Sequence, residues 1–146
     1  MIIFGVDFGD ARTGLAVCDP LEMLASPAGV ITEYDFDRCA QKTADAAKAA
    51  KAEEIVVGHP LNMDGSCGAR AQKCEEFAEK LRGLTGLPVV LWDERRTTVT
   101  AHQMLNDTNT RGKKRKAVVD AVAATVILEG YLAFRKHQRT SPGQNE

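Results

Sequence analysis

Acidic side chains occupy three places in this sequence where neighbouring residues are mainly apolar. Asp7 ends the run IIFGVD, Asp93 and Glu94 end PVVLWDE, and Asp120 is the only charge within AVVDAVAATVIL. A buried carboxylate without a partner costs several kcal/mol. A divalent cation shared by acids from these places would remove that cost, and oxygen ligands alone favour Mg²⁺ or Mn²⁺ over Zn²⁺.

Each acid also has a local alternative that requires no metal. Asp7 could accept hydrogen bonds from amides of the turn that follows it. Basic residues that could form ion pairs with the other acids are Arg95 and Arg96 beside Asp93 and Glu94, and Arg115 and Lys116 ahead of Asp120. Taken singly, therefore, no acid identifies a metal site.

A basic run, RGKKRK, lies directly ahead of the segment that carries Asp120. Its five charges belong to Arg111, Lys113, Lys114, Arg115 and Lys116. Such a run is often only a solvated surface, but its position here favours contact with phosphates, which weakens as salt rises. The glycine-rich turn DFGDARTG could also present backbone amides to a phosphate.

The expected elements alternate in a way that predicts an α/β fold with a mixed sheet flanked by helices. Strands are expected at residues 2–6, 15–19, 27–34, 54–58 and 88–94; helices at 36–51, from Ala71 to near Gly83, from a Thr97 or Thr98 cap through Leu105, and at 115–134. Ligands in such folds bind at the carboxyl ends of parallel strands. Asp7 and the pair Asp93–Glu94 stand at such ends.

Length and composition predict one domain, residues 1–136, with a flexible C-terminal tail at 137–146. The net charge is −1, so a nucleic-acid partner must meet a local patch rather than a basic protein. There is no secretory signal and no apolar stretch of membrane-spanning length, so we expect a cytoplasmic protein with no membrane contact. The four cysteines form no CxxC pair, and we expect free thiols.

Four segments, VDFGDARTGLAV, VVGHPLNMDGS, DERRTT and KKRKAVVDAVAA, together resemble the YqgF family of RNase H-like nucleases, also called RuvX. They follow the family's order and span residues 2 to about 133. The resemblance implies a three-layer RNase H-like fold with a five-stranded mixed sheet. It also implies an acidic triad at the ends of the first and the fourth-in-space strands and on the last helix.

Carried onto this sequence, the triad corresponds to Asp7, Glu94 and Asp120, with Asp93 as the alternative to Glu94 because neighbouring strand residues face opposite sides. We expect these acids to hold two Mg²⁺ or Mn²⁺ ions. Predicted nucleic-acid contacts are Gly9, Arg12, Thr13, Asn62 and Arg95, together with the basic run. His59 and Arg96 stand where the family usually has apolar residues; we expect His59 to face solvent, with substrate contact or proton transfer as its alternative.

The function that the resemblance implies is a metal-dependent hydrolase that cuts phosphodiester bonds in structured RNA, at the 5′ end of pre-16S ribosomal RNA. The first alternative is a Holliday-junction resolvase acting on branched DNA, which would work as a homodimer rather than a monomer. A second is a scaffold that binds nucleic acid without cutting it. An ATPase like the sugar kinases, which share a similar hairpin, would need a second domain for which this length leaves no room.

Overall fold

The computed structural model describes residues 1–96 and 112–140, and in the last helix the side chains of residues 122–138 only. Its elements are β1 (Ile3–Asp7), β2 (Arg12–Cys18), β3 (Ala25–Thr32), α1 (Phe36–Ala49), β4 (Glu54–His59), α2 (Ala69–Thr85), β5 (Val89–Asp93), the short 3₁₀ turn η1 (Glu94–Arg96) and α4 (Gly112–Thr140). The predicted helix from Thr97 or Thr98 to Leu105 lies outside the described residues.

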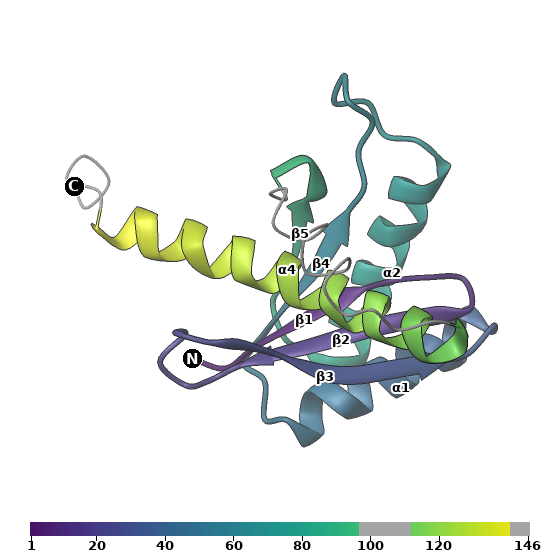
Figure 1. The fold of residues 1–146 in the computed structure, drawn as a ribbon, viewed down its shortest axis with the longest axis horizontal. Helices are drawn as coiled ribbons and strands as arrows, with labels where there is room; N and C mark the ends of the chain where they lie inside the picture. The colour runs from purple at the N-terminus through teal and green to yellow at the C-terminus, as the bar shows by residue number, and fades with distance from the viewer. Residues whose placement is uncertain (97–111, 141–146) are drawn as a thin grey trace.

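The five strands form one mixed sheet in the order β3-β2-β1-β4-β5. β1 pairs antiparallel with β2, and β2 with β3, whereas β1, β4 and β5 run parallel to one another. Helix α4 crosses one face of the sheet, and α1 and α2 cover the other (Figure 1). The predicted three-layer α/β architecture is therefore confirmed, and β5 is an edge strand, not the fourth strand in space.

Alternating side chains of the strands build two hydrophobic cores. Phe4, Val6, Ile55 and Val57 belong to the core beneath α1 and α2, which also contains Phe77. Ile3, Val56 and Trp92 belong to the other core, with Ala124 and Leu128 of α4. Because side chains alternate along a strand, this division fixes the face to which each residue at a strand end belongs.

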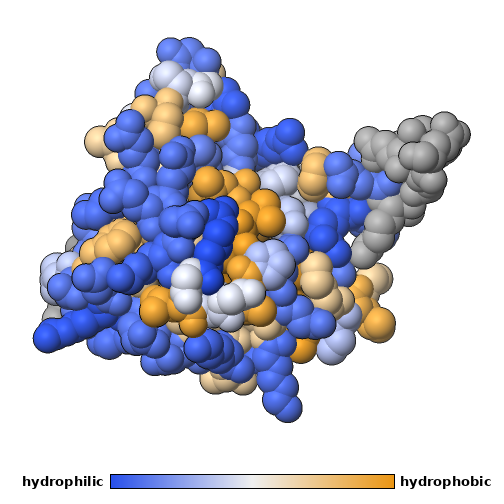
Figure 2. All heavy atoms as spheres, turned by 180° about the vertical axis from the view of Figure 1, so that it is seen from behind, coloured by the Kyte–Doolittle hydropathy of each residue, from blue (hydrophilic) through white to orange (hydrophobic). Residues whose placement is uncertain are grey.

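The outer side of α1 and α2 is mostly polar, as Figure 2 shows, with hydrophobic atoms gathered in its middle. A shallow groove on this side is lined by Phe36 of α1 and by Gly83 and Leu84 of α2, with Asp37 and Lys80 among its charged residues. No helix in the described part of the chain is long and apolar enough to cross a membrane.

The predicted ends of two helices need correction. α2 runs through Gly83 and ends at Thr85, because Gly86 adopts the left-handed conformation (φ 70°) that closes a helix. α4 begins at Gly112 instead of Arg115 and continues to Thr140, so the first residues of the predicted tail are helical. Lys, Arg and Gln are good helix formers, and the first proline after them is Pro142.

The turn between β1 and β2 is tightly packed. A Cβ atom on Gly9 would lie 2.0 Å from the carbonyl oxygen of Arg12, so this turn requires glycine. Thr13 is fully buried, and its hydroxyl accepts a hydrogen bond from the Gly9 amide at 3.3 Å. The same hydroxyl lies 3.2 Å from Cys39 Sγ. Thr13 therefore holds the hairpin against α1.

An ion-pair network joins the loop after β2 to the end of α4. Arg135 Nε donates to Glu22 Oε1 at 2.8 Å, and the N-terminal ammonium donates to Glu22 Oε2 at 3.1 Å. The Arg135 hydrogen bond, followed by that from the N-terminus, lowers the pKa of Glu22 to about 2 from its ordinary 4.5. The side chain of Glu22 is only 6% exposed, which limits solvent screening of these contacts.

We expect Glu22→Gln to lower the free energy of unfolding by about 1–2 kcal/mol at pH 7. A carboxylate with a lowered pKa stabilises the fold above its ordinary pKa, and this contribution disappears as pH falls from 4.5 toward 2. Urea denaturation of both proteins across this range measures the difference, with Glu129→Gln on the exposed side of α4 as control. An equal loss at every pH would assign the effect to packing instead of charge.

Candidate active site

Asp7 and Glu94 belong to the same face of the sheet, the one covered by α4. A Cβ atom on Gly5 would lie 2.9 Å from Leu128 Cβ of α4, and Asp7 shares the side of Gly5 by strand alternation. A Cβ atom on Gly58 would lie 2.6 Å from Ile127 Cδ1 of α4 and 2.9 Å from Glu94 Oε2. The Glu94 carboxylate therefore rests on the bare backbone of Gly58, near the end of β4.

Asp93 belongs to the opposite face and already has a cationic partner. It pairs in register with His59, and its carboxylate accepts hydrogen bonds from Arg95 Nε at 3.0 Å and Nη2 at 2.7 Å. These bonds lower the pKa of Asp93. The predicted ion pair with Arg95 thus exists for Asp93, and Glu94 is the acid directed toward the side of Asp7.

Glu94 is half-buried, so its carboxylate is partly desolvated. Burial raises its pKa, and the positive charges of Arg70 and His59 only partly oppose this shift. Within residues 1–96 and the described part of α4, no hydrogen bond or ion pair reaches its carboxylate. A carboxylate in this condition suits a cation, because the cation would compensate the cost of burial.

Arg70 is a site residue that sequence reasoning missed. It lies in the first turn of α2, where its Nη2 donates to the carbonyl oxygen of Phe8 at 2.6 Å and its Nη1 lies 3.5 Å from Asp10. Its charge also acts on Glu94. The only signal in the sequence that could have indicated Arg70 is its position at the start of a helix. Helix α2 packs over the end of β1, and this packing brings Arg70 to the site.

The thiol of Cys74 lies near both acids. Burial raises its pKa to about 12; the charge of Arg70 opposes this shift, and the charges of Glu94 and Asp7 add to it. The charges of both carboxylates and of the arginine therefore all act on the buried Cys74 thiol. Asp7, Glu94 and Arg70 are gathered at one end of the sheet.

Helix α4 brings the backbone of Asp120 toward this end. Tyr131 donates to Glu54 Oε2 at 2.6 Å, at the start of β4, whereas Ala124 and Leu128 lie over Gly5 in the middle of β1. The helix thus runs opposite to β1, and its N-terminal half extends toward the end occupied by Asp7. The side chain of Asp120 is outside the described residues.

The predicted nucleic-acid contacts differ in exposure. Asn62 is exposed in the loop after β4, and Arg95 is exposed beside it, with its Nη1 3.4 Å from the carbonyl oxygen of Met63. Gly9 and Arg12 are partly exposed at the β1–β2 turn, but Thr13 is buried and cannot meet a ligand directly. Arg111 and the side chains of Lys113, Lys114, Arg115 and Lys116 lie outside the described residues.

His59 and Arg96, the two residues that depart from the family pattern, have structural partners. His59 ends β4 and does not face solvent, since its side chain is 14% exposed and its Nε2 lies 2.8 Å from Glu75 Oε2 of α2. Arg96 stacks over the rings of Trp92 and Phe134, at 5.2 and 5.3 Å from their centroids. The expectation that His59 faces solvent is therefore wrong, because α2 covers the end of β4.

Solved structures share this architecture. RuvC of *T. thermophilus* in complex with a Holliday junction superposes with a TM-score of 0.58 at 15% identity, over 92% of this chain and 96% of that one. The fowlpox virus Holliday junction resolvase gives 0.52 at 14% identity, over 92% and 99%. The fold is that of the RNase H-like resolvases, as predicted.

Sequence comparison narrows this class to one family. The family model RuvX, described as Holliday junction resolvase, matches residues 1–134. A *Lachnospira eligens* protein named "Putative pre-16S rRNA nuclease" is 44% identical over 93% of this chain and 99% of its own length, and a *Halothermothrix orenii* protein of the same name is 42% identical over 92% and 96%. The chain belongs to the RuvX family of phosphodiester-cleaving nucleases.

Proposed function

We propose that Asp7, Glu94 and Asp120 form the acidic centre of a nuclease that depends on Mg²⁺ or Mn²⁺. The observation that carries this proposal is the carboxylate of Glu94, which is partly desolvated, has no partner among the described residues and lies on the same sheet face as Asp7. A set of carboxylate oxygens fits a hard divalent cation. Asp93 is left out because Arg95 engages it.

Helix geometry supports the inclusion of Asp120. Asp120, Ala124 and Leu128 are spaced by four residues and so share one side of α4. The four residues from Ala124 to Asp120 advance about 6.0 Å along α4, and the two residues from Gly5 to Asp7 advance about 6.6 Å along β1. Since Ala124 lies over Gly5, we infer that Asp120 stands over Asp7.

The acids and Arg70 would have different roles in cleavage. Two bound ions would activate a water molecule and stabilise the leaving oxygen of the phosphodiester. Asp7, Glu94 and Asp120 would hold and orient these ions. Arg70 lowers the pKa of Glu94 against the effect of burial and so favours the ionised form that binds a cation. Its position at the β1 end also suits it to meet a substrate phosphate.

The substrate that we propose is structured RNA at the 5′ end of pre-16S ribosomal RNA. This proposal is supported by the names of relatives that are up to 44% identical over nearly the whole chain. A four-way DNA junction is the second candidate, favoured by the family description and by the fold shared with RuvC. Cutting two strands symmetrically favours a homodimer, whereas RNA processing needs only a monomer. We propose that either activity belongs to the cytoplasm.

One experiment separates these candidates. Purified protein is incubated with Mg²⁺ or Mn²⁺ and, in parallel, with a precursor ribosomal RNA fragment and a four-way DNA junction. We expect cleavage of the RNA, and preferential cleavage of the junction would favour the resolvase. Binding of either substrate without cleavage would favour a scaffold. Light scattering on the same samples measures the oligomeric state.

The basic run gives a separate prediction. Replacing Lys113, Lys114 and Arg115 together by alanine should weaken RNA binding about equally for different sequences, because phosphate contacts carry no base information. The slope of log affinity against log salt should flatten by about 2 to 3, close to one for each lost contact. Fluorescence titrations at several salt concentrations measure it, with Lys48→Ala at the end of α1 as control. An unchanged slope would assign the run to a solvated surface.

A further inference from the structure

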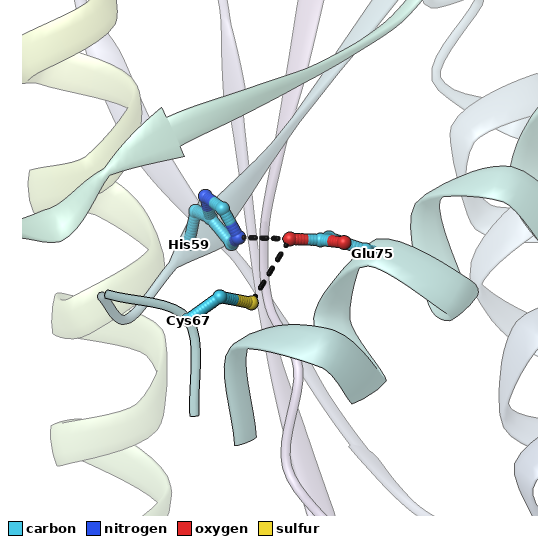
Figure 3. Close-up of side chains that lie close together, drawn as sticks. All are labelled: His59, Cys67 and Glu75. Atoms are coloured by element: carbon cyan, nitrogen blue, oxygen red, sulfur yellow. Dashed lines mark hydrogen bonds and ion pairs between the residues drawn. The ribbon is translucent and has the colours of Figure 1, made fainter. Parts of the chain in front are cut away.

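A second group of ligand-type side chains lies beside the acidic centre, on the other face of the sheet. His59 comes from the end of β4, Cys67 from the loop before α2, and Glu75 from the second turn of α2. Figure 3 shows the imidazole and the thiol both directed at the Glu75 carboxylate. Three elements thus direct a nitrogen, a sulfur and an oxygen to one point.

The distances between these atoms approach those of a metal site. His59 Nε2 and Cys67 Sγ lie 2.8 and 3.2 Å from the same oxygen, Glu75 Oε2. One ligand atom from each residue lies within 4.8 Å of the other two. In a tetrahedral zinc site with bonds of about 2.0–2.3 Å, ligand atoms are about 3.3–3.8 Å apart. Small side-chain rotations would therefore open the required space.

The loop that carries Cys67 is held in shape by its own hydrogen bonds. The Asn62 amide donates to the Ser66 carbonyl at 3.0 Å, and the Gly65 amide donates to the Asn62 carbonyl at 2.8 Å. Gly65 has a φ of 88°, which glycine adopts without strain. The loop thus presents Cys67 to α2 in a defined position, which reduces the entropic cost of binding an ion.

We propose that His59, Cys67 and Glu75 bind one zinc-class transition-metal ion, separate from the acidic centre. A thiolate, an imidazole and a carboxylate suit Zn²⁺, whereas oxygen ligands alone suit Mg²⁺. Cys67 is exposed and the Glu75 side chain is 45% exposed, so the fourth position opens to solvent for a water molecule. On binding, the Cys67 thiol releases its proton to solvent, and the bonds to Glu75 give way to bonds to the ion.

The ion would fasten the loop at 60–68 to α2 beside the acidic centre. The residue before His59 is Gly58, on which the Glu94 carboxylate rests. The same loop contains Asn62, and the Met63 carbonyl in it accepts a hydrogen bond from Arg95. A bound ion would therefore order a predicted substrate-contact loop without joining the three acids.

Cobalt substitution tests this proposal on the full-length protein. We expect metal-free protein to bind one Co²⁺ with a thiolate-to-cobalt charge-transfer absorption, which ions at an all-oxygen centre cannot give. Zn²⁺ should displace this Co²⁺, and excess Mg²⁺ should not. Cys67→Ser should abolish the absorption and weaken Zn²⁺ binding, measured against a chromophoric chelator, by more than about a hundredfold.

Matched variants separate this site from other effects. Cys74→Ala, which removes a buried thiol next to Glu75, should retain the absorption, as should Asp7→Asn at the acidic centre. Should Cys67→Ser fail to fold, Glu75→Gln is compared with Glu79→Gln one turn further along α2, and only the former should weaken Zn²⁺ binding. Absence of the absorption in the wild-type protein, or its survival in Cys67→Ser, would overturn the proposal.

Discussion

Glu94→Gln is expected to reduce cleavage by about a thousandfold or more while leaving the protein folded. Holding the catalytic ions supplies several kcal/mol of transition-state stabilisation, and each 1.4 kcal/mol corresponds to about tenfold in rate. Single-turnover cleavage with saturating Mg²⁺ measures the loss. Asp7→Asn should behave in the same way, because both acids lie on the α4 face of the sheet.

The neighbouring acid provides the matched control for this prediction. Asp93→Asn changes the same chemical group one residue away, on the opposite face, where it contacts Arg95. It should therefore keep most of the activity. Equal losses in Asp93→Asn and Glu94→Gln would contradict the assignment of Glu94, and activity that survives in Asp7→Asn would remove the acidic centre as a whole.

Thermal stability distinguishes loss of a metal ligand from loss of the fold. The raised pKa of Glu94 means that its ionisation is less favourable in the folded than in the unfolded protein. Stability therefore falls as pH rises from the ordinary pKa of 4.5 through the raised value. At pH 7 without metal, Glu94→Gln should melt at the same or a higher temperature than the wild type, and a lower one would indicate a structural role.

Most of the fold could be predicted because its elements carry strong local signals. The apolar runs before Asp7, His59 and Asp93 are strands, and their order along the chain implied the mixed sheet. Helix ends were less predictable. Gly83 and Gly86 are both plausible stops, and only Gly86 takes the left-handed conformation, whereas a Cβ atom on Gly83 would meet no neighbouring atom within 4 Å.

The site was predictable in part for the same reason. Asp7 and Glu94 were visible as charges at strand ends, and the family resemblance favoured Glu94 over Asp93. The packing of Trp92 against α4 adds a physical reason, because side chains alternate along a strand and Asp93 must therefore face the other side. Arg70, and the group formed by His59, Cys67 and Glu75, carry no such signal. The three residues of this group lie at least 8 residues apart, in a strand, a loop and a helix. Only the packing of α2 against the sheet brings them together.

Gly58→Ala is expected to reduce cleavage by about a hundredfold and to lower the free energy of unfolding by about 1–3 kcal/mol. The added methyl group would lie 2.9 Å from Glu94 Oε2 and 2.6 Å from Ile127 Cδ1. Both atoms are at the ends of side chains, but Ile127 is buried in the core beneath α4, so its displacement costs stability whereas the half-buried Glu94 side chain can move. The carboxylate would shift by about 1 Å, and a misplacement of this size at a catalytic group can cost about a hundredfold in rate.

Another glycine of the chain provides the comparison. Gly83→Ala adds the same methyl group within α2, where it meets nothing within 4 Å, and it should raise the free energy of unfolding by about 0.5–1 kcal/mol without changing cleavage. Cleavage rates at several Mg²⁺ concentrations and urea denaturation measure both variants. Full activity in Gly58→Ala would mean that Glu94 tolerates displacement, which a residue that positions a catalytic ion should not.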